Sequence, residues 1–214
     1  NNYYDLLKRV RSFKKPVILS TGMNNIASIK PAVQIFERLN NPYALLHCTS
    51  MYPTPFDKVR LGGLTELKSV FPNAVVGLSD HSIGNYTCFA AVSLGASILE
   101  KHFTSNKSWD GPDIPISIDP YELKDLIYGT ESIFKALGGD KSILIEEKPT
   151  IDFAYACVVS ISEIKKGEIF SENNIWVKRP GTGEIKAKDY EKIIGMTSSR
   201  EINVDEQIKW TDAK

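Results

Sequence analysis

The sequence lacks an excess of charge of either sign, because 26 Lys and Arg residues are matched by 26 Asp and Glu residues. A formal net charge of zero gives no overall field that would attract nucleic acid or an anionic membrane surface. The sequence also lacks any apolar run near the roughly 18 residues that a bilayer-spanning helix needs. These absences argue against nucleic-acid and membrane partners.

Cysteine is scarce, with three residues at Cys48, Cys88 and Cys157. They form no CxxC pair and no regular ladder, which is typical of a reducing compartment where each thiol acts as a small buried hydrophobe. We therefore expect a cytoplasmic protein. The first residue is Asn rather than Met and residues 1–13 already have a helical pattern, so we expect the chain to be the later portion of a longer protein.

Residues 1–138 alternate between short apolar runs and amphipathic stretches. The apolar runs predict strands that recur every 23 to 31 residues with a helix between them, which is typical of βα units with a parallel sheet. Four such units form either half of an eight-stranded (β/α) barrel or a small doubly wound sheet. The predicted strands are 16–20, 43–50, 74–80 and 97–103, and the predicted helices are 3–13, 29–40, 61–71, 85–95 and 119–139.

The pattern changes after residue 138. Residues 139–150 are charged and predict a linker, and residues 151–214 predict a small β-rich second domain. Its expected strands are 153–160, 174–180 and 195–202, with a brief helix at 187–195.

Two of the three histidines, His81 and His102, come at the ends of the third and fourth predicted strands. The carboxyl ends of parallel strands carry the loops that build active sites. Adjacent strands lie about 4.8 Å apart, so two imidazoles at these ends can bind one divalent ion. The alternative is that each is a half-buried, hydrogen-bonded structural residue. His47 is expected to be structural, because alternation turns it away from Cys48 and Ser50.

Hydroxyl residues also end three of the strands, at Ser20, Ser50 and Ser79. Hydroxyls and loop amides that converge at one barrel mouth can hold a phosphate, although Ser more often simply caps a helix. Tyr52 in "YPTP" and Asp113 in "GPDIP" lie in rigid turns that either face a ligand or are turns only.

Several motifs, in this order along the chain, closely resemble the sialic acid synthase family: "KPVILSTGM", "LLHCTSMYPTPFDKVRLGGL", "VVGLSDHSIGNY", "SILEKHFT", "GPDIPISI", "EKPTIDFAYACVV" and "VKRPGTG". The resemblance implies strands five to eight of a (β/α)₈ TIM barrel followed by a small antifreeze-like (SAF) domain. It also implies condensation of phosphoenolpyruvate with an N-acylated amino sugar such as N-acetylmannosamine, with release of phosphate.

The resemblance further implies that His81 and His102 bind a divalent metal, typically Mn²⁺ with Mg²⁺ or Co²⁺ as alternatives. This ion polarises the sugar aldehyde for attack by the enol carbon. Asp113 is the third residue implied to be catalytic.

The same family pattern assigns the remaining positions. It implies that Ser20 and Ser79 hold the phosphate of phosphoenolpyruvate with Ser50, and that Tyr52 and Asp113 line the sugar site. It implies that Phe153 and Arg179 reach the sugar from the SAF domain, which caps the partner's barrel in a domain-swapped homodimer.

Two departures from the family pattern remain. Ser50 stands where many sialic acid synthases have Asn, so a legionaminic or pseudaminic acid synthase is an alternative. The first four barrel strands and their glutamate and lysines are absent, so we expect this chain alone to be inactive. An alternative of another class is a non-catalytic sugar-binding or scaffold module.

Overall fold

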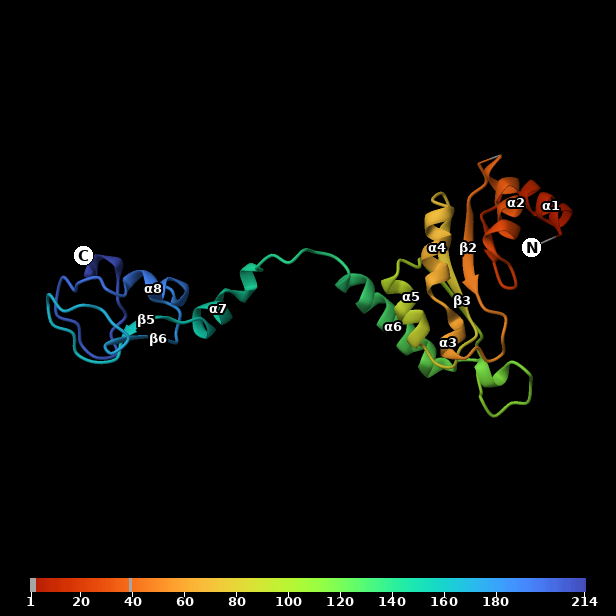
Figure 1. The fold of residues 1–214 in the computed structure, drawn as a ribbon. Coiled ribbons are helices and arrows are strands. Elements are labelled where there is room, and N and C mark those ends of the chain that lie inside the picture. The colour runs from red at the N-terminus through yellow and green to blue at the C-terminus, as the bar shows by residue number, and fades with distance from the viewer. Residues whose placement is uncertain (1–2, 39) are drawn as a thin grey trace. The chain divides into compact units, whose positions relative to one another are not determined.

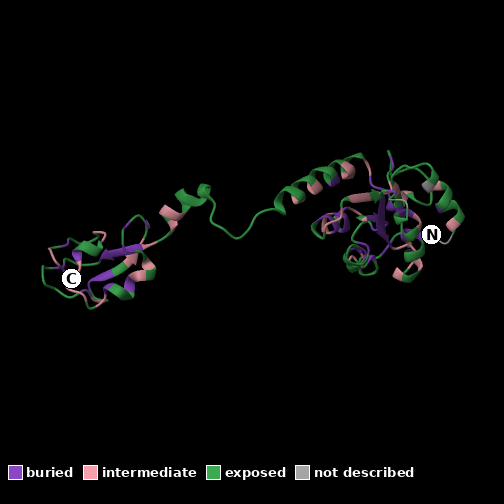
Figure 2. Ribbon diagram, turned by 90° about the horizontal axis from the view of Figure 1, so that it is seen from above, coloured by how far each residue is buried: buried purple, intermediate pink, exposed green. Residues whose placement is uncertain are grey.

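The structure, a computed structural model, describes residues 3–38 and 40–214. These residues divide into two compact units, the first extending to Gly139 and the second spanning Asp140–Lys214. Each unit has its own buried core (Figure 2). Residues 1, 2 and 39, which fall within stretches predicted to be helical, lie outside the described residues.

Within the described part of the first unit, four parallel strands form one curled sheet in the order β1-β2-β3-β4 (Figure 1). Strands that follow each other in the chain are neighbours in the sheet, as repeated βα units produce. The sheet resembles half a barrel, which confirms the predicted α/β class with parallel strands. The strands are β1 (Val17–Ser20), β2 (Tyr43–Cys48), β3 (Val75–Asp80) and β4 (Ile98–Lys101).

Helices separate the strands, as the apolar periodicity predicts. None of the described helices is long and apolar enough to cross a bilayer. The helical elements are α1 (Tyr4–Ser12), α2 (Ile26–Glu37), α3 (Phe56–Val59), α4 (Gly62–Val70), α5 (Tyr86–Ser93), the 3₁₀ turn η1 (Ile114–Ile116) and α6 (Pro120–Ala136).

The core of the first unit lies between the helices and one face of the sheet. Leu45 on β2 and Leu78 on β3 are at most 1% exposed there, packed with Phe36 of α2. The opposite face of the sheet is less covered at its edge, where Ile18 of β1 is 57% exposed. Within the described residues β1 and β4 each have a strand neighbour on one side only.

Helix α6 begins with a capping box at Asp119. The Asp119 carboxylate accepts a hydrogen bond from the backbone N–H of Glu122 at 2.8 Å, and the Glu122 carboxylate accepts one from the backbone N–H of Asp119 at 2.9 Å. We expect Asp119→Ala to lower the free energy of unfolding by about 1 kcal/mol, because a first-turn N–H loses its acceptor. Urea titration measures this change. Asp119→Asn, which keeps an acceptor, should lose less, and an equal loss in both variants would contradict the capping role.

The second unit has a small antiparallel sheet, which in the described residues consists of β5 (Cys157–Ser160) and β6 (Ile175–Lys178). Its core contains Phe170, Ile185 and Ile202, each at most 2% exposed. The remaining elements are η2 (Ile145–Glu147), α7 (Lys148–Ala154), η3 (Ala187–Asp189), α8 (Tyr190–Ile193) and η4 (Trp210–Asp212).

Two predictions for this unit were wrong in detail. Residues 153 and 154 belong to α7 rather than to a strand, because Pro149 in the first turn favours a helix start there. Residues 195–202 form isolated bridges, such as Ile169 with Thr197 and Ile164 with Ile202, instead of a continuous strand. Their polar run "TSSR" offers few side chains to pack on a sheet face.

Candidate active site

The two histidines at the strand ends lie close together. His81 and His102 are the first residues beyond β3 and β4, and their ring centroids are 5.2 Å apart with the planes inclined by 75°. His81 is 6% exposed, whereas the side chain of His102 is 30% exposed. One ring is therefore held inside the fold while the other borders solvent.

A backbone carbonyl and a thiol contact the His81 ring. Its Nδ1 lies 3.0 Å from the carbonyl oxygen of Thr49, and 3.9 Å from the Cys48 sulfur. Because a carbonyl can only accept a hydrogen bond, Nδ1 is the donor in this contact, so in the neutral imidazole the lone pair lies on Nε2. This is the arrangement in which a histidine is ready to bind a metal through Nε2.

Tyr52 completes a cluster of three rings. Its ring centroid lies 4.2 Å from that of His81 and 5.9 Å from that of His102. The loop that carries it contains a cis Tyr52–Pro53 peptide. The backbone N–H of Thr54 in this loop donates to the carbonyl of His81, directly after β3, at 3.0 Å. With 54% of its surface exposed, Tyr52 forms one wall of the site.

Asp113 approaches His102 from the loop before η1. Its Oδ2 lies 3.7 Å from His102 Nδ1, and its side chain is 58% exposed. The N–H of Ile118 donates to the His102 carbonyl at 2.8 Å, which fixes the backbone at this position. Asp113 therefore has one oxygen beside an imidazole and remains accessible to a ligand.

The three predicted phosphate-binding serines lie at, or within two residues of, the ends of neighbouring strands but differ in their surroundings. The Ser79 hydroxyl is buried and donates to Glu100 Oε1 at 2.8 Å, so its proton is directed at a carboxylate. Ser50 is half-buried with its Oγ 4.0 Å from the Cys48 sulfur, and Ser20 at the end of β1 is exposed.

His47 lies on the other face of β2. It is 8% exposed, and its Nε2 is 2.7 Å from the carbonyl oxygen of Val59. A side chain on Gly63 would collide with this ring, so α4 packs directly against it. The structure thus places His47 between sheet and helix, away from the three-ring cluster.

Phe153 and Arg179 belong to the second unit. Phe153 lies on α7 and is 69% exposed, and Arg179 is exposed directly after β6, before a cis Arg179–Pro180 peptide. Both side chains are accessible on the surface of their own unit.

A buried ion pair beside the histidines was not found from the sequence. Asp80 and Lys101 form a 2.7 Å ion pair with side chains 1% and 4% exposed. Burial acts to raise the pKa of the Asp80 carboxyl, but the hydrogen bond and charge of Lys101, with hydrogen bonds from Thr87 and Ser82, hold this pKa below its usual value. The available signal was that each residue directly precedes one of the two histidines.

The sequence profile of the NeuB family matches residues 1–142. The chain belongs to the NeuB family. The profile of the SAF domain matches residues 155–214, so the resemblance inferred from the motifs is confirmed for both parts.

Relatives of this NeuB-family chain include proteins named as synthases. It is 41% identical to the N,N'-diacetyllegionaminic acid synthase of Campylobacter jejuni over 95% of this chain and 61% of that protein. The structure of the spore coat polysaccharide biosynthesis protein SpsE of Bacillus subtilis aligns with all of this chain. The alignment spans 65% of the SpsE chain, with 34% identity and a TM-score of 0.60. The sialic acid synthetase of Leptospira borgpetersenii covers 69% of this chain and 52% of its own, with 38% identity and a TM-score of 0.63. This chain therefore spans less than two thirds of these proteins.

The donor set of this NeuB-family chain fits part of a divalent metal site. The described residues contain no group of three or more His, Cys, Asp or Glu side chains placed to hold an ion. They do offer two neighbouring imidazoles, one with its Nδ1 proton committed to a carbonyl and the other with Nδ1 beside Asp113. A carbonyl acceptor such as that of Thr49 orients metal-binding histidines, and the two imidazoles fit as a half-site that needs further ligands.

Proposed function

We propose that the chain is the C-terminal half of a (β/α)₈ synthase barrel joined to a SAF domain. In this proposal the complete, cytoplasmic enzyme condenses phosphoenolpyruvate with an N-acylated amino sugar to give a sialic or related nonulosonic acid and phosphate. The observation that carries the proposal is the pair of imidazoles 5.2 Å apart beyond β3 and β4. The names of the relatives, which include sialic acid and legionaminic acid synthases, support this reaction class.

The open sheet supports the barrel part of the proposal. β1 and β4 have strand neighbours on one side only among the described residues, and Ile18 of β1 is exposed on the face away from the helices. Four preceding strands would pair with both edges and cover this face, closing the barrel. Unpaired edges and an exposed apolar residue would otherwise favour aggregation.

His81 and His102 are the residues that would hold the metal, Mn²⁺ in our proposal. A divalent ion bound there supplies Lewis-acid stabilisation for the oxyanion that develops on the sugar aldehyde. The Thr49 carbonyl keeps the His81 ring in the tautomer with a free Nε2, and Asp113 faces His102 Nδ1. We assign the remaining ligands to water and to residues of the preceding strands.

The other site residues of the chain bind and orient the substrates. Three serines lie at or near the ends of neighbouring strands, where hydroxyls can donate to the phosphate of phosphoenolpyruvate: Ser20, Ser50 and Ser79. Ser79 must turn its proton from Glu100 to the phosphate to do so. The Tyr52 ring covers both histidines and excludes water from one side of the site.

The second unit is proposed to complete the sugar site of a partner subunit in a domain-swapped homodimer. The guanidinium of Arg179 offers several directed donors for an N-acyl carbonyl, and Phe153 offers an apolar face to the sugar. Both side chains are exposed on their own unit, as contacts to another barrel require.

A coupled assay of phosphate release tests the reaction and the sugar. The complete enzyme, Mn²⁺ and phosphoenolpyruvate are incubated in parallel with N-acetylmannosamine and with the diacetamido sugars that precede legionaminic and pseudaminic acids. We expect phosphate release that depends on one of these sugars, with one new carboxylated product by mass spectrometry. The 41% identity to a legionaminic acid synthase favours the legionaminic precursor as a second candidate beside N-acetylmannosamine. If none of the three sugars gives phosphate release, the non-catalytic alternative is favoured.

A further inference from the structure

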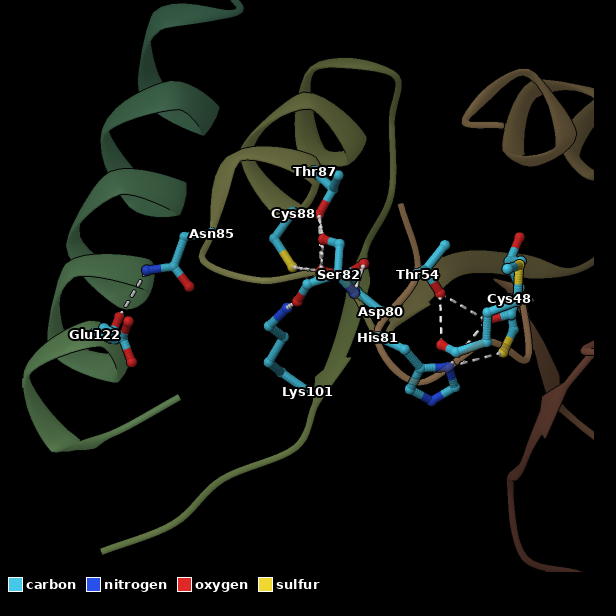
Figure 3. A network of polar contacts seen from close by, with 12 residues as sticks. Cys48, Thr54, Asp80, His81, Ser82, Asn85, Thr87, Cys88, Lys101 and Glu122 are labelled. Carbon is cyan, nitrogen blue, oxygen red and sulfur yellow. Dashed lines mark hydrogen bonds and ion pairs between the residues drawn. The ribbon is translucent and has the colours of Figure 1, made fainter. Parts of the chain in front are cut away.

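The Asp80–Lys101 ion pair lies directly behind the two histidines. Asp80 and Lys101 are register partners and the last paired residues of β3 and β4, and each is followed by a histidine. Successive side chains of a strand point to opposite faces. Figure 3 shows this at the end of β3, where Lys101, Ser82, Thr87 and Cys88 surround Asp80 while His81 points away, toward Cys48.

The side chain of Asp80 is held in place, because several groups bind its carboxylate. Besides Lys101 Nζ at 2.7 Å, it accepts hydrogen bonds from the backbone N–H of Ser82 at 3.0 Å, the Ser82 hydroxyl at 2.9 Å and the Thr87 hydroxyl at 2.7 Å. The Cys88 thiol contributes a weaker contact at 3.6 Å. Thr87 and Cys88 belong to α5, so the carboxylate joins the end of β3 to that helix.

Lys101 connects the fourth strand to the same centre. Its Nζ donates to Asp80 and also to the Ser82 carbonyl, which lies one residue beyond His81. Lys101, the residue that precedes His102, therefore binds both neighbours of His81, Asp80 through its carboxylate and Ser82 through its backbone carbonyl. Beyond the last register pair, no strand pairing of the described residues holds the two histidines at their separation.

We propose that the Asp80–Lys101 pair is a positioning device that sets the spacing of His81 and His102 and thereby the affinity of the metal site. This inference rests on the proposed function, because it assigns the two histidines to one ion. It predicts that the ion pair affects metal affinity through geometry, since neither charged group touches the ligand face of the sheet.

The test is a Mn²⁺ titration followed by electron paramagnetic resonance, using the complete enzyme. In the double variant Asp80→Asn/Lys101→Met both charges are removed, so no unpaired charge is left buried. We expect it to bind Mn²⁺ about 10- to 100-fold more weakly, the range found for outer-shell changes at metal sites. The KM for phosphoenolpyruvate should change less than kcat. The single variant Lys101→Arg, which keeps the charge and a donor, should retain most of the wild-type affinity for Mn²⁺.

Two further variants make the outcome decisive. Tyr43→Phe removes a hydrogen bond to Glu37 at the amino end of the same sheet and should leave Mn²⁺ affinity unchanged. Thr87→Val removes one donor to Asp80 with little change in shape and should also weaken Mn²⁺ binding. This variant serves as the test if the double variant does not fold. Wild-type affinity in a folded double variant, or in Thr87→Val where the double variant is unfolded, overturns the inference.

His102→Ala separates failure of this inference from failure of the proposed function. If His102→Ala loses Mn²⁺ and the positioning variants keep it, the ion pair is structural only. If His102→Ala itself keeps Mn²⁺, the metal site and with it this inference are wrong.

Discussion

Replacement of His81 by Ala in the complete enzyme is expected to abolish tight Mn²⁺ binding and to lower kcat/KM by at least about 10³-fold. Lewis-acid stabilisation by a bound metal is worth several kcal/mol, and each 1.4 kcal/mol corresponds to a tenfold change in rate. His102→Ala should behave in the same way, because the two rings lie 5.2 Å apart and are proposed to hold one ion. Calorimetric titration with Mn²⁺ and the phosphate-release assay measure the two effects.

The third histidine supplies the matched control. His47 contacts the Val59 carbonyl on the helix side of β2, so His47→Ala should lower stability without changing Mn²⁺ affinity. The double variant His81→Ala/His102→Ala should lose hardly more than either single variant, because both ligands act on the same ion. Unchanged Mn²⁺ affinity in both single variants would remove the metal from the mechanism.

The parts of the fold that follow from apolar pattern were predictable. The strand "VVGLSD" is buried on both faces after its first residue, so its hydrophobicity indicates a parallel sheet. The helix predicted over residues 119–139 was equally clear from its amphipathic pattern and is observed as α6. Residues 195–202 were harder, since an irregular β-rich unit takes its shape from scattered bridges between distant residues.

The sequence predicted which side chains of the candidate site lie together at the strand ends, but not their distances or orientations. Alternation places His81 and His102 on neighbouring strands, but the 5.2 Å separation depends on sheet curl and on how each ring is turned. The position of Tyr52 depends on a cis peptide before Pro53, which the sequence does not specify. Asp80 and Lys101 were overlooked because charged residues are rarely buried unless they are paired, and pairing is a property of the tertiary structure.

A second large loss of activity is expected from replacement of Arg179, which is exposed directly after β6. If its guanidinium donates to the N-acyl carbonyl of the sugar, Arg179→Ala should lower kcat/KM by about 10- to 100-fold, the range that a hydrogen bond involving a charged group provides. The Tm should stay within about 2 °C of the wild type, because replacement of a surface residue away from special features changes stability little. Arg179→Lys keeps the charge but not the fork and should recover only part of the activity.

Mixing two defective variants tests whether Arg179 acts on its own barrel or on a partner's barrel. His102→Ala lacks a proposed metal ligand in the barrel, and Arg179→Ala lacks the proposed sugar contact in the SAF domain. In a swapped homodimer, random reassociation of equal amounts makes half of the dimers mixed, and each mixed dimer has one site with both residues intact. The mixture should therefore recover about a quarter of wild-type activity, because the two sites of a symmetric dimer are equivalent. If the SAF domain serves its own barrel, no site in a mixed dimer is intact, and the mixture should show no more activity than the two variants measured separately.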